Sequence, residues 1–171
     1  MIRALIGWTL RWWPALALVT SAAMLAIAHA FETFGHLAPC HLCLLQRDVY
    51  WWALPICAAA VLVAYGGRLA VLKPWLGAAM GAAFLVGCGI AVYHAGAEWK
   101  FWPGPASCSG GSHAVNAAAL SDLLKGATLT QPRCDVAAWR FLWLSMAGWN
   151  ALISLKLAVW SLVWAAWSRK R

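Results

Sequence analysis

The stretch CHLCLLQRDVYWWALPICAAAVLVAY, residues 40–65, decides the fold of this chain. From Cys43 to Tyr65 it is long and apolar enough to cross a bilayer, which takes about 20 mostly apolar residues. At its start, Cys40 and Cys43 form a C-x-x-C motif. The stretch therefore predicts a membrane helix with a pair of thiols at its boundary.

The rest of the chain continues the membrane pattern. Of its 171 residues, 64% are hydrophobic and 11% are charged, which is too little charge for an ordinary soluble surface. Apolar runs at about 12–31, 74–96 and 141–167 predict three further spans besides 43–65. We therefore expect one domain over residues 1–171, an all-α membrane protein built as a four-transmembrane-helix bundle.

The positions of the basic residues indicate the orientation. Thirteen Lys and Arg against five Asp and Glu give a net charge of +8. Seven of these bases lie near the two termini and in the turn between the second and third spans: Arg3, Arg11, Arg68, Lys73, Arg169, Lys170 and Arg171. By the positive-inside rule, both termini and this turn are expected in the cytoplasm, and segments 32–39 and 97–140 on the outer side. Bases at the ends of apolar runs, rather than on one polar face, argue against nucleic-acid binding.

The long polar loop, about residues 97–140, carries Cys108 and Cys134. An oxidising compartment allows them to pair. Gly, Ser and Pro around both favour mobile backbone that suits disulfide exchange, although a plain structural disulfide is the alternative. Between them, residues 113–124 have the pattern of a short amphipathic helix that can lie in the membrane surface. Two cysteine pairs on one side of the membrane indicate electrons passing from a soluble partner into a membrane acceptor.

The chemistry of Cys40 and Cys43 is expected to be redox. A helix N-terminus stabilises a thiolate, and sulfurs three residues apart can close a small disulfide. Haem attachment needs His directly after the second cysteine, where this chain has Leu44. Structural zinc needs four ligands. Cys108 and Cys134 could supply two more, but there is no second C-x-x-C. Inert thiols are the remaining alternative, and we expect no metal.

Two further residues are expected at the depth of this pair. Arg47 lies one helical turn after Cys43, where a cation in a membrane segment is costly. It either snorkels to the surface or pairs with Asp48, or it stabilises a Cys43 thiolate or an anionic acceptor, which is the interpretation we prefer. His94 falls at the outer end of the third span, level with Arg47, and either a structural or a functional role is open to it.

Residues 1–30 have an alternative interpretation as a signal peptide, with a basic start and Ala28-His29-Ala30 as a cleavage site. The length of the apolar run argues for a span instead. Trp12 and Trp13 support the span, because they are expected to act as interface anchors.

Three residues inside the spans are left without a part in this chemistry. Cys57 and Cys88 lie at different depths, so we expect small buried hydrophobic side chains rather than a bridge. Lys156 in the fourth span has no clear role.

Taken together, these residues resemble the DsbB family of bacterial disulfide-forming membrane proteins over essentially the whole chain. The likeness rests on four spans, the C-x-x-C at the outer start of the second span with Arg47 after it, and the loop cysteines ahead of the fourth span. The stretch Tyr93-His94-x-Gly-x-Glu98, followed by Trp102-Pro103-Gly104-Pro105-x-x-Cys108, looks like one branch of that family. A familiar member has Glu where this chain has Gln46, which puts in doubt an essential acid there.

The resemblance implies a protein-disulfide oxidoreductase of the bacterial inner membrane. Such a protein reoxidises a periplasmic DsbA-like thioredoxin-fold partner and passes two electrons to a membrane quinone, ubiquinone or menaquinone. The resemblance implies that Cys108 forms the mixed disulfide with the partner, with Cys134 as its loop mate, and that exchange then reaches Cys40 and Cys43. The residues implied to contact the quinone are Cys43 as a thiolate, Arg47, His94 and Met146.

Two alternatives belong to other classes. A vitamin K epoxide reductase-like protein couples similar cysteine pairs to a quinone, but it usually carries its C-x-x-C on a late helix, after the loop cysteines. Here the C-x-x-C comes first. A non-enzymatic membrane protein that uses its cysteines as metal ligands or as structural staples is the other alternative.

Overall fold

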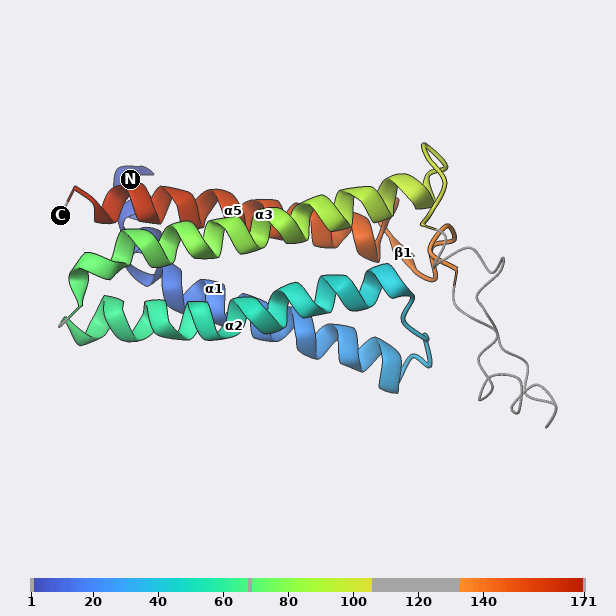
Figure 1. The fold of residues 1–171 in the computed structure, drawn as a ribbon, viewed down its shortest axis with the longest axis horizontal. Helices are drawn as coiled ribbons and strands as arrows, with labels where there is room; N and C mark the ends of the chain where they lie inside the picture. Colours follow the sequence, from blue (N-terminus) through green and yellow to red (C-terminus); the bar gives the residue numbers. More distant parts are fainter. Residues whose placement is uncertain (1, 68, 106–132, 171) are drawn as a thin grey trace.

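Four long helices side by side form the body of the protein, as the computed structural model shows (Figure 1). The structure describes residues 2–67, 69–105 and 133–170. The long helices are α1 (Ile2–Thr33), α2 (His41–Gly66), α3 (Lys73–Glu98) and α5 (Met146–Ser168). Each is long and apolar enough to cross a membrane. The predicted four-helix membrane bundle is therefore confirmed. The amphipathic helix expected at 113–124 and Cys108 lie outside the described residues.

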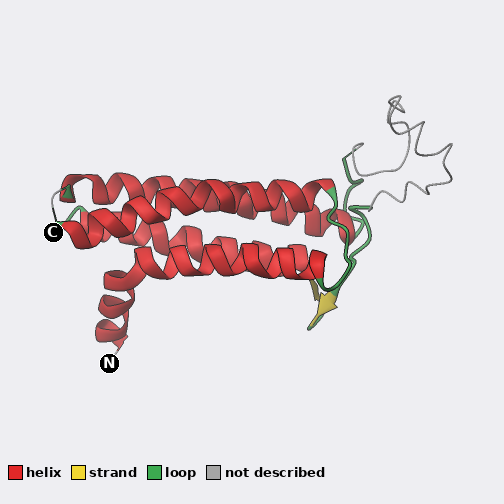
Figure 2. Cartoon of the chain, turned by 90° about the horizontal axis from the view of Figure 1, so that it is seen from below, coloured by secondary structure: helices red, strands yellow, loops and turns green. Residues whose placement is uncertain are grey.

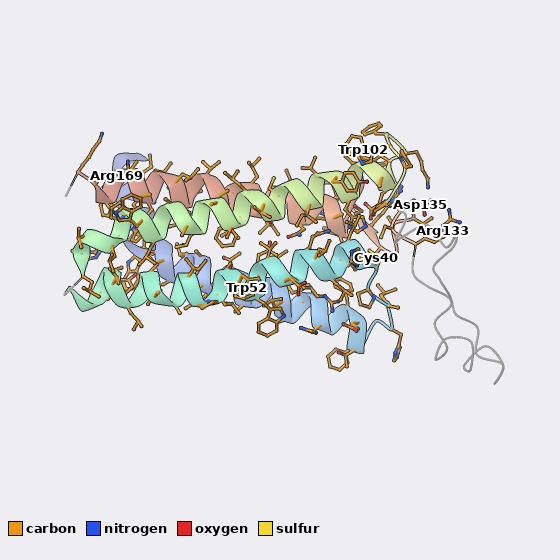
Figure 3. The ribbon with its side chains drawn as sticks, in the orientation of Figure 1. Cys40, Trp52, Trp102, Arg133, Asp135 and Arg169 are labelled. Carbon is orange, nitrogen blue, oxygen red and sulfur yellow. The ribbon has the colours of Figure 1, made fainter. Side chains whose placement is uncertain are left out.

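The two ends of the bundle carry different segments of the chain. Both chain termini lie at one end, together with the turn from α2 through the short helix η1 (Ala70–Leu72) into α3 (Figure 1). Gly67 ends α2 in the left-handed conformation, with φ of 72°. The opposite end, here called the loop end, carries residues 34–40, 99–105 and 133–145. Figure 3 shows Arg169 at the terminal end, and Cys40 and Asp135 at the loop end.

Helix α1 is longer than the predicted span and is bent. Figure 2 shows its first turns leaving the direction of the bundle. Pro14 lies within the helix and removes one backbone hydrogen bond, which is a common cause of a sharp bend. Trp13 is buried, and its indole N–H donates to Ser161 Oγ of α5 at 3.1 Å. The expectation that Trp13 is an interface anchor is therefore wrong, whereas Trp12 is exposed.

Helix α5 begins at Met146, five residues later than the fourth predicted span. The residues before it form a small hairpin of β1 (Arg140–Phe141) and β2 (Leu144–Ser145). Leu142 and Trp143 at its turn have φ of 49° and 71°, which a helix does not allow. Ser145 then caps α5, with its hydroxyl accepting from the Gly148 N–H at 3.2 Å. Apolar composition alone cannot distinguish such a hairpin from the start of a span.

Small residues bring α3 and α5 close together. A Cβ added at Gly77 would lie 2.8 Å from Ala165 Cβ and 2.8 Å from Trp164 Cε3. Close approach through small residues is a usual way for membrane helices to associate. Cys57 is fully buried in the core, as expected of a small hydrophobic side chain, and Cys88 is half-buried. Lys156 is exposed on α5, and nothing in the structure explains it.

Replacing Gly77 with alanine should lower the stability of the bundle by about 1–3 kcal/mol, because the methyl group overpacks the α3–α5 contact. Gly89 of the same helix is the matched control, since an added Cβ there has nothing within 4 Å. The measurement is the thermal unfolding midpoint of the two variants in detergent. A midpoint for Gly77→Ala equal to that of Gly89→Ala would show that the close contact does not limit stability.

Candidate active site

The thiols of Cys40 and Cys43 lie together at the first turn of α2. Cys40 caps the helix, and its Sγ accepts the backbone N–H of Cys43 at 3.4 Å. The two Sγ atoms are 2.9 Å apart and share a hydrogen bond. Neither of them is in a disulfide here. The hydrogen bond from Cys43, supported by His94, lowers the pKa of Cys40 to about 4 against the effect of burial. Cys40 is therefore the sulfur that carries the negative charge.

His94 of α3 is placed beside this pair by a buried amide network. Its Nε2 lies 3.7 Å from Cys40 Sγ, and its Nδ1 lies 2.9 Å from Gln46 Nε2. Asn150 Nδ2 donates to Gln46 Oε1 at 2.5 Å, which fixes the direction of the Gln46 amide. Gln46 therefore donates to His94 Nδ1, and the proton of neutral His94 sits on Nε2, facing Cys40. A glutamate carboxylate at this position could not donate that hydrogen bond.

The network continues to greater depth in the bundle. The hydroxyl of Tyr50 donates to Asn150 Oδ1 at 2.6 Å and lies 3.0 Å from Ser154 Oγ. All of these side chains are buried, yet each has a hydrogen-bond partner. Buried polar groups are costly in an apolar interior unless they are satisfied, and inside a membrane they usually mark a functional site. The chain of hydrogen bonds therefore connects the thiol pair to the middle of the bundle.

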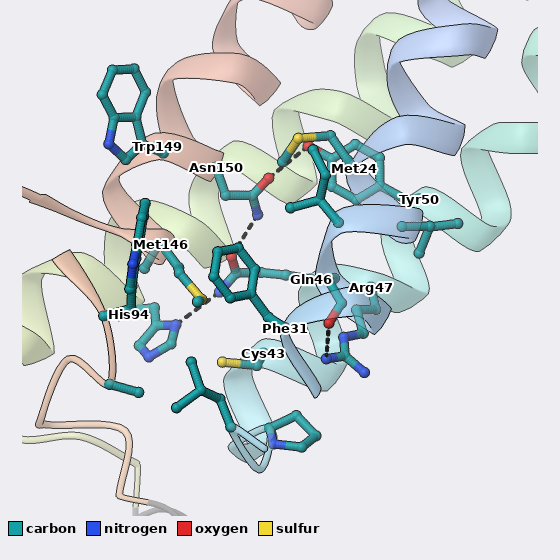
Figure 4. A pocket seen from close by; sticks show the side chains of 18 of the residues that line it. Met24, Phe31, Cys43, Gln46, Arg47, Tyr50, His94, Met146, Trp149 and Asn150 are labelled. Atoms are coloured by element: carbon teal, nitrogen blue, oxygen red, sulfur yellow. Dashed lines mark hydrogen bonds between the residues drawn. The ribbon is translucent and has the colours of Figure 1, made fainter. Parts of the chain in front are cut away.

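A cavity of about 380 Å³ opens on the other side of Cys43 (Figure 4). All four residues that the resemblance implies as quinone contacts line this cavity: Cys43, Arg47, His94 and Met146. Its remaining wall is mainly apolar and comes from α1, α2, α5, residues 37–39 and the segment that leads into the hairpin, including Met24, Phe31 and Trp139. A mainly apolar cavity with a few polar groups at one side is typical of a small-molecule site.

Arg47 has a partner that the sequence did not indicate. Its guanidinium donates from Nη1 to Glu32 Oε2 at 2.5 Å and from Nη2 to the Ala28 carbonyl oxygen at 3.0 Å. Both acceptors belong to α1, and the Arg47 side chain is only 13% exposed. The alternative of a pair with Asp48 is therefore wrong, because Asp48 is exposed and α1 satisfies the arginine. Helix α1 thus holds Arg47 against the cavity.

Cys134, in the segment between α3 and α5, lies beside the thiol pair. It is fully buried and disulfide-bonded. Its Sγ, the Sγ of Cys40 and a ring nitrogen of His94 all lie within 4.8 Å of one another. A disulfide sulfur is not a thiolate ligand, so this arrangement fits thiol–disulfide exchange better than metal binding. Cys108 lies outside the described residues.

Ion pairs fix the segment that carries Cys134. Asp135 accepts from Arg133 at 2.9 and 2.8 Å and from Lys100 Nζ, just after α3, at 2.8 Å. These hydrogen bonds, Arg133 first, hold the pKa of Asp135 well below its usual range. Lys100 also donates to the Asp135 carbonyl oxygen at 2.6 Å. The segment is thereby tied to the end of α3, next to His94.

Sequence reasoning missed four polar residues of this site, although a signal was present. They are Tyr50, Glu98, Asn150 and Ser154. With Gln46 and His94 they form three pairs, each four residues apart on one helix and so on one helical face. A polar pair at this spacing within an apolar span indicates a buried polar face.

Replacing Asn150 with leucine should raise the pKa of Cys40 and lower stability by about 1–3 kcal/mol, because the Gln46 amide loses its buried partner and no longer orients His94. The measurement is the pH dependence of thiol modification at Cys40, mapped by mass spectrometry, together with thermal unfolding. Ser154→Ala is the control, since Ser154 lies at the far end of the network. Thiol modification with an unchanged pH profile in Asn150→Leu would contradict the proposed orientation of His94.

Four helices of membrane length, a reduced thiol pair and a neighbouring disulfide cysteine beside an apolar cavity define a membrane protein of thiol–disulfide chemistry. The family model for disulfide bond formation protein DsbB matches residues 10–164. The chain is 30% identical over 154 residues to "Disulfide bond formation protein B 2" of Pseudomonas entomophila (strain L48), covering 86% of each protein. The chain therefore belongs to the DsbB family. No solved structure matches it significantly.

Membership of this family confirms the resemblance drawn from the sequence. It makes the chain a multi-pass membrane protein of disulfide bond formation, with the disulfide oxidoreductase activity of the family. This favours disulfide chemistry over the vitamin K epoxide reductase-like and scaffold alternatives.

Proposed function

We propose that this protein is a quinone-dependent thiol:disulfide oxidoreductase that reoxidises a periplasmic DsbA-like thioredoxin-fold partner. One observation carries the proposal: Cys43 lines the large cavity, whereas Cys40 lies beside the disulfide cysteine Cys134. The inner thiol pair thus has a protein disulfide on one side and an apolar cavity on the other. A pair in this position can accept electrons from the loop and deliver them into the membrane.

The residues that line the cavity fit a quinone. Its volume of about 380 Å³ lies within the range of about 300–1,000 Å³ for small-molecule sites. Arg47 and His94 can polarise carbonyl oxygens, while Phe31 and Met146 supply apolar contacts for the ring. A bound quinone, ubiquinone or menaquinone, would supply an acceptor of two electrons and two protons. The position of Cys43 on the cavity wall makes it the sulfur that meets this acceptor.

Electrons are proposed to enter through the loop. The partner reduces the loop disulfide by way of a mixed disulfide with Cys108, which frees Cys134. The Cys134 thiolate attacks Cys40 in the oxidised Cys40–Cys43 disulfide, a new Cys134–Cys40 bond forms, and Cys43 leaves as a thiolate. The Cys108 thiolate then attacks Cys134, which restores the loop disulfide and releases the Cys40 thiolate.

The chemistry of Cys40 suits the second of these steps. A thiol of low pKa leaves a disulfide more readily than one of ordinary pKa. The pKa of Cys40, about 4, therefore favours its departure from Cys134. The result of the two steps is a loop disulfide and a reduced inner pair; in the structure Cys134 is disulfide-bonded and Cys40 and Cys43 are free, which supports this order.

The proposed location is the bacterial inner membrane, with both termini in the cytoplasm and the loop end in the periplasm. The support is that seven of the thirteen Lys and Arg lie, in the sequence, near the two termini and in the turn between α2 and α3. Figure 3 shows Arg169 at the end of the bundle opposite Cys40. This orientation presents the loop to a periplasmic partner and the cavity to the quinone pool of the bilayer.

The test is turnover of the purified protein in detergent, with a reduced thioredoxin-fold partner and ubiquinone or menaquinone. The expected result is one quinone reduced for each partner dithiol oxidised. Cys88→Ala is the control for loss of an unrelated span cysteine and should keep full turnover. Oxidation of the partner without any loss of quinone would contradict the proposal.

A further inference from the structure

A buried carboxyl side chain, Glu98, lies near the thiol pair, and the exchange steps above do not use it. Glu98 is the last residue of α3, one helical turn after His94. Its side chain is 5% exposed, and its Oε1 lies 3.7 Å from His94 Nε2. Its Oε2 is buried and has no hydrogen-bond partner among the described residues. An acid buried in this way needs an explanation.

Glu98 also faces a small second cavity. This cavity of about 50 Å³ is bordered by Cys40, Cys43, His94 and Glu98, and on its other side by the exposed residues Arg133 and Val136. One water molecule needs about 10–15 Å³ of such space, so a few waters fit. The cavity therefore gives Glu98 a short route toward the exposed residues of the loop end.

The charges around Glu98 disfavour two anions at once. The titratable groups that face it are His94 on its own helix, Cys40 and Cys43 at the start of α2, Arg140 of β1 and Arg133 at the second cavity. A Cys40 thiolate and a Glu98 carboxylate would repel each other in a site with little water. A protonated acid removes this repulsion, and it also removes the cost of an unpartnered carboxylate oxygen.

We propose that in the reduced protein Glu98 holds the proton that the Cys40 thiolate lacks, with the waters of the second cavity connecting the two groups and the Nε2–H of His94 lying between them. The distances from His94 Nε2 to Cys40 Sγ and to Glu98 Oε1 are both 3.7 Å. The proton reaches the Glu98 carboxylate through the waters of the second cavity, while the Nε2–H of His94 stays in place as a donor. The sum is Cys40–SH and Glu98–COO⁻ becoming Cys40–S⁻ and Glu98–COOH, with no net change of charge.

This role rests on the proposed function for its place in the cycle. When the inner pair is oxidised, Cys40 and Cys43 lose two electrons and form one S–S bond. The two protons that accompany those electrons come from the Cys43 thiol and from Glu98–COOH. Glu98 returns to the carboxylate, and the charge of −1 that was on Cys40 before oxidation is then on Glu98. The oxidised and reduced states thus differ in the protonation of one buried acid.

Infrared difference spectroscopy of reduced minus oxidised protein tests this inference without quinone or partner. The protein is reduced with a phosphine and oxidised with a small disulfide. We expect the carbonyl stretch of a protonated carboxylic acid in the reduced state only, shifted in D₂O and absent in Glu98→Gln. The chain has only five Asp and Glu, so the band is readily assigned. Asp48→Asn, which removes an exposed carboxylate of α2, should keep it.

Two further results decide the outcome. Glu98→Asp should keep the band at a changed frequency, which identifies the acid even if Glu98→Gln does not fold. Thiol counting must show that the inner pair is reduced and oxidised in each sample. A redox difference spectrum of the native protein without a protonated-acid band, or a band that persists unchanged in Glu98→Gln, would overturn the inference. Because no quinone is present, either result leaves the proposed function to its own turnover test.

Discussion

Replacing Cys43 with serine should abolish quinone reduction by the thiol partner, with a loss of roughly 10³-fold or more, because the attacking sulfur at the cavity wall is gone. The Cys43 side chain borders the large cavity, and Cys40 does not. No second thiol among the described residues can therefore replace it at this wall. The measurement is the loss of quinone absorbance under excess reduced partner.

The same variant should also trap an intermediate. Without Cys43, the Cys40 thiol remains within reach of Cys134, and these sulfurs lie within 4.8 Å of each other. The Cys40 thiolate can attack Cys134 in the loop disulfide, so that a Cys40–Cys134 bond forms and the other loop cysteine leaves as a thiolate. Peptide mapping should detect this disulfide. Cys88→Ala, which removes a half-buried span cysteine, should show neither effect. Normal turnover in Cys43→Ser would rule out the proposed electron path.

Replacing Arg47 with methionine should raise the KM for quinone by about 10- to 150-fold. The loss of a hydrogen bond from a charged donor costs about 1.5–3 kcal/mol, and each 1.36 kcal/mol is a factor of ten. Methionine keeps an unbranched apolar stem in the cavity but leaves Glu32 and the Ala28 carbonyl without their donor. The measurement is steady-state kinetics with varied quinone.

Two controls separate this effect from misfolding. Formation of the mixed disulfide with the partner should proceed at the normal rate in Arg47→Met, because that step takes place in the loop. Arg47→Lys should give an intermediate KM, since a single ammonium cannot reproduce the two-pronged contact with Glu32 and the Ala28 carbonyl. A KM unchanged in both variants would show that the arginine is held by α1 for structural reasons alone.

The parts of this protein that were predictable from sequence are those set by local composition. Four apolar runs of sufficient length gave the four helices, and the helix cap at Cys40 follows from a C-x-x-C at the start of such a run. The boundary of α5 was not predictable, because Phe141, Leu142 and Trp143 are as apolar as a span. Only their backbone conformation shows the hairpin.

The parts that were not predictable depend on which helices meet. Arg47 is fifteen residues after Glu32, and its pairing requires knowledge of how α1 packs on α2. The link from Gln46 to Asn150 joins residues 104 positions apart. Trp13 shows the same limit, since only the bundle reveals that its indole bonds Ser161 rather than lying at an interface.

The most direct test of the central claim is a single turnover without any partner. The purified double variant Cys108→Ser, Cys134→Ser, whose loop cannot reduce the inner pair again, is fully reduced, freed of reductant, and mixed with one equivalent of quinone under anaerobic conditions. The account predicts loss of one equivalent of quinone absorbance and, by peptide mapping, a disulfide between Cys40 and Cys43. Quinone that stays oxidised while the Cys40–Cys43 pair remains reduced would contradict it.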